Sequence, residues 1–482
     1  MYLTSQMPRK SRSATCLAIV SMLSVVGATF AAQPAFAQPA APPPAAPAPA
    51  ATAAAAPAPV AKLENTGGVP VEVHGSYFSR YEWRQNYDEL GVSGGRFLEG
   101  DRAVYRFRTS LTTGPMDVGG DRKVIAHFAP QASGFYPGAG TAGNTNPTIG
   151  ESDLGVVEGY LRLKDPTWSL DVGRFIMNYG ISAVIGSLDW HQSARSFQGA
   201  RFTYQLPEKA YVDAFFTQQV EGSSADPRFT GGDEYFAGIY SGLAPLVPVF
   251  KTFDVYALSK AWGSRSETAT NPKVGRAIQT TVGTLIKGEA GPLDYILEGG
   301  LQFGKRRRPL NAMTMATKND EVLAYNIDAE IGVKVAKGLR VAGYGAYVSG
   351  EDGKGKVNSW DELYPTTHAF FGLTDVMGQR TNIADGAFRA SYAATEKTML
   401  RLDFHNFFRP EDYNLARMGK QSGYAGSEAD MHLIQKLGKG LVARALYGVF
   451  IPGSDMFYKN AMATEASDKT AHYVEVELRY DF

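Results

Sequence analysis

The chain contains one cysteine in 482 residues, Cys16, and that residue lies in an N-terminal leader. An exported form without the leader has no thiol and no disulfide, so hydrogen bonding and packing alone must hold it together. Cys16 precedes the apolar run of the leader rather than following it, which argues against a lipoprotein acylation site.

Catalytic signatures are also missing. The sequence has no Gly-x-Ser-x-Gly elbow, no His-Glu-x-x-His, no phosphate-binding loop and no Cys/His metal spacing. The seven histidines are scattered along the chain. We therefore predict no enzymatic activity and no cofactor.

An excess of positive charge is absent too. Lys and Arg number 48, as do Asp and Glu, and three of the basic residues but no acids lie in the leader, so the exported chain has a formal charge of −3. A protein that binds the phosphate backbone needs a basic surface. Nucleic acid is therefore not an expected partner.

The N-terminus has the pattern of a secretory signal peptide, predicted over residues 1–37. Arg9, Lys10 and Arg12 precede an apolar run that begins at Leu17, and Ala35-Phe36-Ala37 offers small residues for cleavage. Residues 38–67 are then rich in Ala and Pro, a composition typical of an extended, disordered tether. In the periplasm this tether could bind a partner or serve only as a spacer.

From residue 68 to residue 482 the chain alternates apolar and polar residues, the pattern of β-strands whose two faces meet different surroundings. In the last strand, Val474, Val476 and Leu478 alternate with Glu475 and Glu477. Eighteen strands are predicted, near 71–84, 101–112, 120–131, 152–164, 167–174, 195–206, 210–220, 233–241, 250–261, 276–288, 292–304, 322–335, 338–349, 384–394, 397–408, 427–437, 440–451 and 470–482.

The connections alternate between short turns and long loops. Short turns include 164–167, 336–338 and 438–440, and the long ones include 305–321 and 350–383. This asymmetry is typical of a transmembrane antiparallel β-barrel of the Gram-negative outer membrane, with short periplasmic turns and long extracellular loops. The sheet must close, because unpaired edge amides are too costly in hydrocarbon. The apolar faces then meet lipid, and the charged faces line a water-filled lumen.

Two stretches resemble the alginate-export family of outer-membrane porins. The first, 172–204, resembles that family's Gly-Arg…Tyr-Gly…Asp-Trp-x-Gln-x-Ala-Arg-x-Phe-x-Gly pattern, and the second, 360–382, its Leu-Tyr-Pro-Thr-x-His…Phe-Gly…Asp element. The matching residues are Gly173, Arg174, Tyr179, Gly180, Asp189, Trp190, Gln192, Ala194, Arg195, Phe197 and Gly199, then Leu363, Tyr364, Pro365, Thr366, His368, Phe371, Gly372 and Asp375. The resemblance implies a monomeric 18-stranded barrel that passes an anionic polysaccharide through an arginine-lined constriction.

Arginine suits a carboxylate path, because its charge is permanent and its guanidinium donates two parallel hydrogen bonds. We predict that the pore is lined by Arg80, Arg106, Arg108, Arg162, Arg174, Arg195, Arg201, Arg389 and Arg401. Inward acids such as Asp328, Glu330 and Glu475 leave a second interpretation open, in which these arginines form structural ion pairs across neighbouring strands.

The sequence therefore favours a channel for an anionic polysaccharide or small anionic solute. One departure from the family is that the turn at 438–440 is short, whereas alginate exporters carry a long gating turn near this point. A general or nutrient-uptake porin is the alternative, and a barrel-borne enzyme or adhesin is a third class. Outer-membrane lipid is an expected partner, and the basic run Lys305-Arg306-Arg307-Arg308 could meet lipopolysaccharide phosphates.

Overall fold

The computed structural model describes residues 61–63, 69–92, 99–136, 152–220, 233–264, 274–311, 314–353, 355–411, 423–454, 456–459, 463 and 465–482. The predicted signal peptide, 1–37, lies outside these residues, as does most of the predicted tether, 38–67. Three residues of that tether, Ala61–Leu63, form a short strand, β1. In the described residues, no helix is both long enough and apolar enough to cross a membrane.

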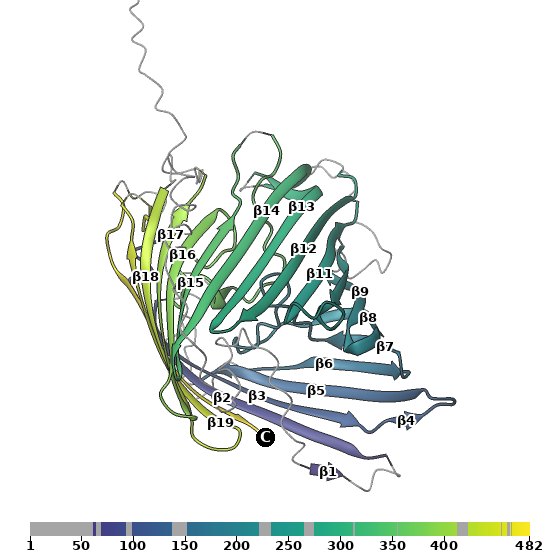
Figure 1. Ribbon diagram of the computed structural model, residues 1–482. Coiled ribbons are helices and arrows are strands. Elements are labelled where there is room, and N and C mark those ends of the chain that lie inside the picture. The colour runs from purple at the N-terminus through teal and green to yellow at the C-terminus, as the bar shows by residue number, and fades with distance from the viewer. Residues whose placement is uncertain are drawn as a thin grey trace, which may run out of the picture. The chain divides into compact units, whose positions relative to one another are not determined.

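The described part of the chain is almost entirely β-structure, with three single-turn 3-10 helices (Figure 1). The elements are β1 (Ala61–Leu63), β2 (Val71–Gln85), β3 (Gly100–Thr113), β4 (Met116–Asp117), β5 (Lys123–Phe135), β6 (Ser152–Lys164), β7 (Trp168–Phe175), β8 (Phe197–Gln205), η2 (Pro207–Lys209), β9 (Tyr211–Val220), β10 (Glu234–Gly242), η3 (Ala244–Leu246), β11 (Thr252–Trp262), β12 (Ala277–Ala290), β13 (Leu293–Asn311), β14 (Thr314–Ala336), β15 (Leu339–Val348), η4 (Thr367–Ala369), β16 (Ile383–Ala393), β17 (Thr398–Arg409), β18 (Gly423–Lys436), β19 (Leu441–Pro452) and β20 (Ala471–Asp481).

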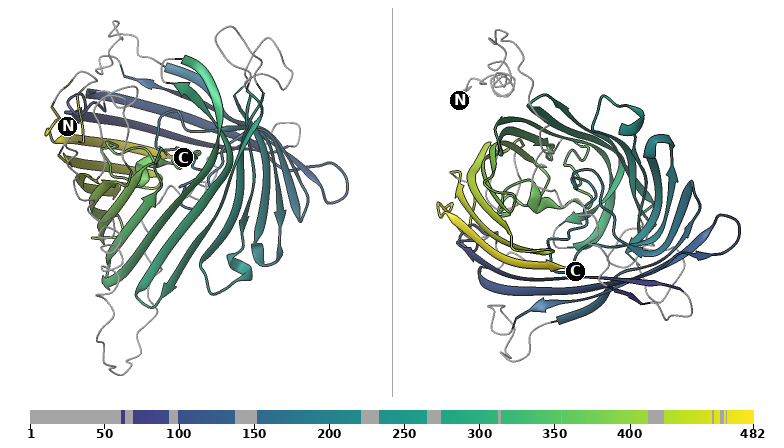
Figure 2. Two further views of the ribbon diagram at one scale, coloured as in Figure 1. Left: turned by 90° about the horizontal axis from the view of Figure 1, so that it is seen from above. Right: turned by 60° about the horizontal axis from the view of Figure 1, so that its bottom comes forward.

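Eighteen of these strands form a closed antiparallel barrel, as predicted. From β5 to β20 each strand pairs with the next, β3 pairs with β2 and β5, and β20 returns to pair with β2 over ten residues. Figure 2 shows the ring that results. The short strands β1 and β4 extend β2 and β5 and do not take part in closure.

The alternation of residue types explains the two faces of the wall. In β14 the side chain of Ile327 is 48% exposed on the outer face, whereas its neighbour Asp328 is 1% exposed on the inner face. Leu478 and Tyr480 face outward in the same way, while Glu475 and Glu477 are buried inside. A strand with this pattern places apolar side chains in lipid and satisfies its backbone entirely within the closed sheet.

One predicted loop is wrong. Residues 305–321 continue β13 and β14 as a long hairpin, in which Asn311 pairs with Thr314. An ion pair stabilises this extension, because Arg308 on β13 lies 3.0 Å from Asp320 on β14. The local sequence of the basic run does not show this pairing, since Asp320 comes twelve residues later.

The seam between β2 and β20 is closed by the last residue of the chain. Gly75 and Phe482 exchange two backbone hydrogen bonds, of 2.7 and 2.8 Å. A Cβ atom at Gly75 would lie 2.2 Å from the Phe482 ring, so a larger residue there would require the ring to move.

Candidate functional site: a lumen occupied by two inward loops

Two long loops fold into the barrel, and we call them the inward loops. They are residues 176–196, between β7 and β8, and 349–382, between β15 and β16. Backbone hydrogen bonds join them: Tyr364 N donates to Val184 O at 3.0 Å and Gly186 N donates to Tyr364 O at 2.8 Å. The two loops therefore form one unit inside the ring (Figure 2).

The inward loops bury apolar side chains against the inner wall. Ile185, Trp360 and Phe371 join one apolar cluster with the wall residues Phe236 and Tyr256. This corrects the expectation of an inner face lined simply by water, because many inward charged groups are covered by the loops and meet protein partners. Burial of an unpaired charge costs several kcal/mol, so the pairing of these groups decides what remains for a solute.

Arg195 and Arg380 hold the inward loops in place. Nη1 of Arg195 donates to the carbonyls of Gly186 and Pro365, at 3.1 and 2.9 Å, and also to that of Tyr364. Arg380 is fully buried and donates to both carboxylate oxygens of Asp328 on β14, at 3.2 and 2.6 Å. Both arginines therefore serve loop placement in this structure.

Three arginines converge on the carboxylate of Asp189, at the tip of the first inward loop. Arg106, Arg108 and Arg479 approach its oxygens at 3.1, 2.9 and 3.3 Å. Burial alone would raise the pKa of Asp189, but the three guanidinium groups outweigh burial and lower this pKa to about 2. One negative charge thus faces three positive charges.

Arg162 and Arg201 share a second carboxylate, Asp171 on β7, at 2.6 and 2.7 Å. We call the five arginines on these two carboxylates the arginine wall: Arg106, Arg108, Arg162, Arg201 and Arg479. Arg108, Arg162 and Arg479 keep side-chain exposures of 15, 31 and 25%. Arg479 also pairs with Asp481 at 3.1 Å, so the five positive charges of the wall face three carboxylates, and part of the wall is open.

The strands from β9 to β15 have a different inner face. There the carboxylates accept hydrogen bonds from tyrosines: Tyr179 donates to Asp213 at 2.7 Å, Tyr240 to Asp254 at 2.6 Å, and Tyr344 to Asp328 at 2.7 Å. Asp328 also pairs with Arg380, whereas these neutral donors leave the negative charge of Asp213 and Asp254 in place. The lumen is therefore basic on the arginine wall and more acidic on this side.

The remaining predicted arginines have separate environments. Arg80 is buried beside Glu82, Glu475 and Glu477, Arg389 pairs with Glu330 at 2.8 Å, and Arg401 pairs with Asp403 at 2.5 Å. Arg174 is half-buried and has no ion-pair or hydrogen-bond partner among the described residues. The structure therefore places four of the nine predicted arginines in the wall and three, Arg80, Arg389 and Arg401, in ion pairs outside it. Arg174 lies on the same face of β7 as Val172, which is 53% exposed on the outside of the barrel.

Sequence reasoning missed the roles of Asp189 and Arg380. Both lie in the stretches that carry the family resemblance, so the motifs marked the region without marking the pairing. Nothing in the local sequence shows that Asp189 meets Arg479, which lies 290 residues away.

A family model described as "Alginate export" matches residues 156–472, about two thirds of the chain. The chain belongs to the alginate export family. The match includes both inward loops and most of the barrel. No curated protein matches the chain in a direct comparison.

Solved structures share the fold of this alginate export family member at low sequence identity. OpdK of Pseudomonas aeruginosa, solved with vanillate, has a TM-score of 0.56 at 11% identity, covering 88% of this chain and 100% of that one. OccK8 (OprE) of the same organism has 0.55 at 10%, covering 86% and 98%, and OccAB3 of Acinetobacter baumannii has 0.54 at 13%, covering 85% and 99%. The family and the fold place the protein in the outer membrane of Gram-negative bacteria, as a channel.

Proposed function

We propose that this channel passes small anionic solutes, carboxylates above all, along the arginine wall. The observation that carries the proposal is that five arginines meet only three carboxylates, Asp171, Asp189 and Asp481. A ring or patch of uncompensated positive charge lowers the barrier for anions and raises it for cations. No bond is broken in this function, and no cofactor is required.

Asp189 already shows how the wall would hold an anion. Its carboxylate receives hydrogen bonds from Arg106 and Arg108, with the bidentate geometry that guanidinium groups offer to carboxylates. A passing carboxylate could exchange with Asp189 or bind the partly exposed guanidinium groups of Arg108 and Arg162. Partial compensation by the acids of the wall keeps the attraction short of trapping.

The inward loops limit the size of the solute that can pass. They pack an apolar cluster across the lumen, which favours a short solute over an extended polymer. The turn between β18 and β19 is short, as predicted, since β18 ends at Lys436 and β19 begins at Leu441. An anionic polysaccharide remains the cargo that the family description suggests, and its passage would require the inward loops to move.

Reversal potentials of single channels in planar lipid bilayers test the proposal. Wild type should prefer anions, and Arg162→Ala should lower the anion-to-cation permeability ratio several-fold. Arg162 is the most exposed arginine of the wall, at 31%, and its removal leaves Asp171 paired with Arg201. Arg122→Ala is the matched control: Arg122 lies in the turn before β5, with a side chain that is 59% exposed, and should leave the ratio unchanged. Cation preference in the wild type would refute the arginine path.

A general nutrient-uptake porin is the second candidate. Asp213 and Asp254, which accept hydrogen bonds from tyrosines, favour it, because they could accommodate cationic or neutral solutes on that side of the lumen. Liposome swelling distinguishes the two candidates. Faster swelling with uronate oligosaccharides than with neutral ones of equal size supports anion transport, and equal rates support a general porin.

We also propose that the channel works as a monomer, with lipid around its apolar outer face. The structure does not favour contact between the basic run 305–308 and lipopolysaccharide, because Arg306 and Arg308 already have protein partners. Arg306 donates to Gln279 and to Ser359 O, and Arg308 pairs with Asp320 at 3.0 Å and Glu351 at 2.9 Å. A periplasmic partner of the Ala/Pro-rich segment 38–67 stays a prediction from the sequence.

A further inference from the structure

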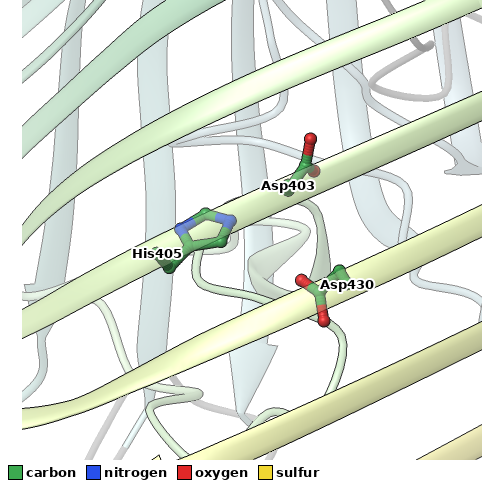
Figure 3. A group of neighbouring side chains, drawn as sticks. All are labelled: Asp403, His405 and Asp430. Atoms are coloured by element: carbon green, nitrogen blue, oxygen red, sulfur yellow. The ribbon is translucent and has the colours of Figure 1, made fainter.

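A second group of ionisable residues lies on the inner face of β17 and β18, apart from the arginine wall. It consists of Asp403, His405 and Asp430, whose ligand atoms all lie within 4.8 Å of one another. Asp403 and Asp430 are directly opposite each other in the strand register. Figure 3 shows the His405 ring and the two carboxylates facing a common space between the strands.

Asp430 lacks a cationic partner. It is 3% exposed; its Oδ2 accepts a hydrogen bond from Leu373 N at 3.1 Å, while its Oδ1 has no hydrogen-bond partner in the described residues. The neighbouring carboxylate of Glu428 accepts from Thr374, through its N at 2.7 Å and its hydroxyl at 2.6 Å, and also lies against Asp430. Two buried carboxylates in contact need either a shared proton or a further positive charge.

Two arginines lie nearby, and each has a partner already. Arg401 binds Asp403 through both oxygens, at 2.9 and 2.5 Å. Arg389 is opposite Asp403 in the register, but its guanidinium pairs with Glu330. His432 also faces Asp403, at 3.9 Å. Asp403 is therefore compensated, and Asp430 is not.

His405 is oriented as metal-bound histidines usually are. Its Nδ1 lies 2.7 Å from Oδ2 of Asp385, and a carboxylate can only accept, so Nδ1 carries the hydrogen. Nε2 then keeps its lone pair for a metal. A carboxylate behind the histidine fixes the ring and raises the basicity of the ligand nitrogen, as in carboxylate–histidine–metal triads.

We propose that Asp403, His405 and Asp430 bind one divalent transition-metal cation, with Zn²⁺ as the best-fitting ion. One imidazole and two carboxylates suit Zn²⁺ and its first-row neighbours, whereas Ca²⁺ and Mg²⁺ prefer oxygen ligands alone. Metal–ligand distances of about 2.0–2.2 Å require the three side chains to draw together from their present separation. This contraction also draws Asp403 away from Arg401, which makes Arg401 the competitor of the metal.

A metal here would tie the second inward loop to the barrel wall. Asp430 accepts from Leu373 N and Glu428 from Thr374 N, and both donors belong to that loop. Fixing the Asp430 carboxylate on a cation would therefore hold the loop segment that rests on it. This role is additional to anion passage and does not depend on it.

The experiment uses the full-length barrel folded in detergent micelles and stripped with a chelator. Zn²⁺ binding is measured by calorimetry, and Co²⁺ is used as a spectroscopic probe. Wild type should bind one Zn²⁺ per chain, and bound Co²⁺ should show the visible absorption of nitrogen and oxygen ligation. Asp430→Asn and His405→Gln should each weaken binding by more than about 100-fold, and Asp385→Asn by about 10–100-fold.

Arg401→Gln should have the opposite effect on Zn²⁺ affinity from the other variants, which a cluster with only a structural role would not produce. Removing the competitor of the metal should tighten Zn²⁺ binding. His472→Gln, at a histidine bonded to Tyr447 away from this group, is the matched control and should leave binding unchanged. The proposal is overturned if wild type binds no Zn²⁺, if His472→Gln loses as much binding as His405→Gln, or if Arg401→Gln weakens binding. Heat-dependent gel mobility verifies that each variant is folded.

Discussion

The arginine wall has two roles, which are to hold the first inward loop and to attract anions. Asp189→Asn is the substitution that separates these roles most clearly. It removes one negative charge from among Arg106, Arg108 and Arg479 while keeping an oxygen that accepts hydrogen bonds. The formal charge of this group rises from +2 to +3. If the wall selects anions, selectivity should rise even though the fold becomes less stable.

The size of the selectivity change follows from Coulomb's law. One unit charge acts on an ion about 8 Å away with about 2 kcal/mol at an effective dielectric constant of about 20. Screening over a Debye length of about 8–10 Å reduces this to about 0.7 kcal/mol. Because the anion gains this energy and a cation loses it, the anion-to-cation ratio should rise by about tenfold.

The stability change follows from the pKa of Asp189. Lowering that pKa from its ordinary value to about 2 corresponds to about 2 kcal/mol of stabilisation by the ionised carboxylate. Since the folded-state pKa is depressed, this contribution is full above about pH 5 and is lost as the pH falls through about 2. Asp189→Asn should therefore unfold at lower temperature at neutral pH and lose less stability on acidification than wild type.

Both effects are measured on one preparation, by reversal potentials in bilayers and by thermal unfolding of the detergent-solubilised barrel across pH. Asp165→Asn is the matched control, because Asp165 lies in the turn between β6 and β7 beside the exposed Arg122. A selectivity ratio that falls or does not change in folded Asp189→Asn would show that the three arginines serve only to hold the loop.

Three further predictions concern the inward loops and the barrel turns. Arg195→Gln should loosen the contact between the inward loops, because three carbonyls lose their donor, and single-channel records should show more frequent conductance fluctuations; records as quiet as those of wild type would contradict this. Burial alone would lower the pKa of His368, but the Asp375 carboxylate at 2.8 Å outweighs it and raises that pKa. This pair therefore stabilises the second loop at low pH, and the contribution is lost as the pH rises through the raised pKa. Conductance fluctuations should increase over the same rise in pH, and His368→Asn should abolish the trend. Gly440→Ala should lower the urea stability of the barrel by about 1–3 kcal/mol, since Gly440 has φ +74° and an added Cβ would lie 2.0 Å from a backbone oxygen; Gly438→Ala, where nothing lies within 4 Å, is the matched control and should be near neutral.

The barrel could be predicted from the sequence because its determinant is local. Strict alternation in strands such as β14 and β20 places Ile327 or Leu478 in lipid and Asp328 or Glu477 inside, and a sheet with such faces must close. The lengths of the connections then fix which end carries the loops. The error at residues 305–321 arose where charged residues, with the ion pair of Arg308 and Asp320 between β13 and β14, replaced the apolar alternation on which the prediction relies.

The interior could not be predicted in the same way. Which arginine meets which acid depends on where the inward loops fold, and the contacts of Asp189 span 81 to 290 residues. The sequence identified Arg106, Arg108, Arg162 and Arg201 as inward, which needs only strand parity. The sequence left open whether these arginines form ion pairs or line an anion path. In the structure all four form ion pairs, but the arginines of the wall outnumber its carboxylates, so positive charge remains.

The seam at which Arg80 of β2 meets Glu477 of β20 has a consequence for biogenesis. These partners are 397 residues apart, so the cylinder cannot be completed until translocation of the polypeptide has delivered its far end. Every earlier hairpin can form from neighbouring segments, whereas this junction alone joins the two extremities of the wall. Until β2 and β20 pair, the nascent sheet has two unpaired edge strands, and the assembly machinery has to shield both of them.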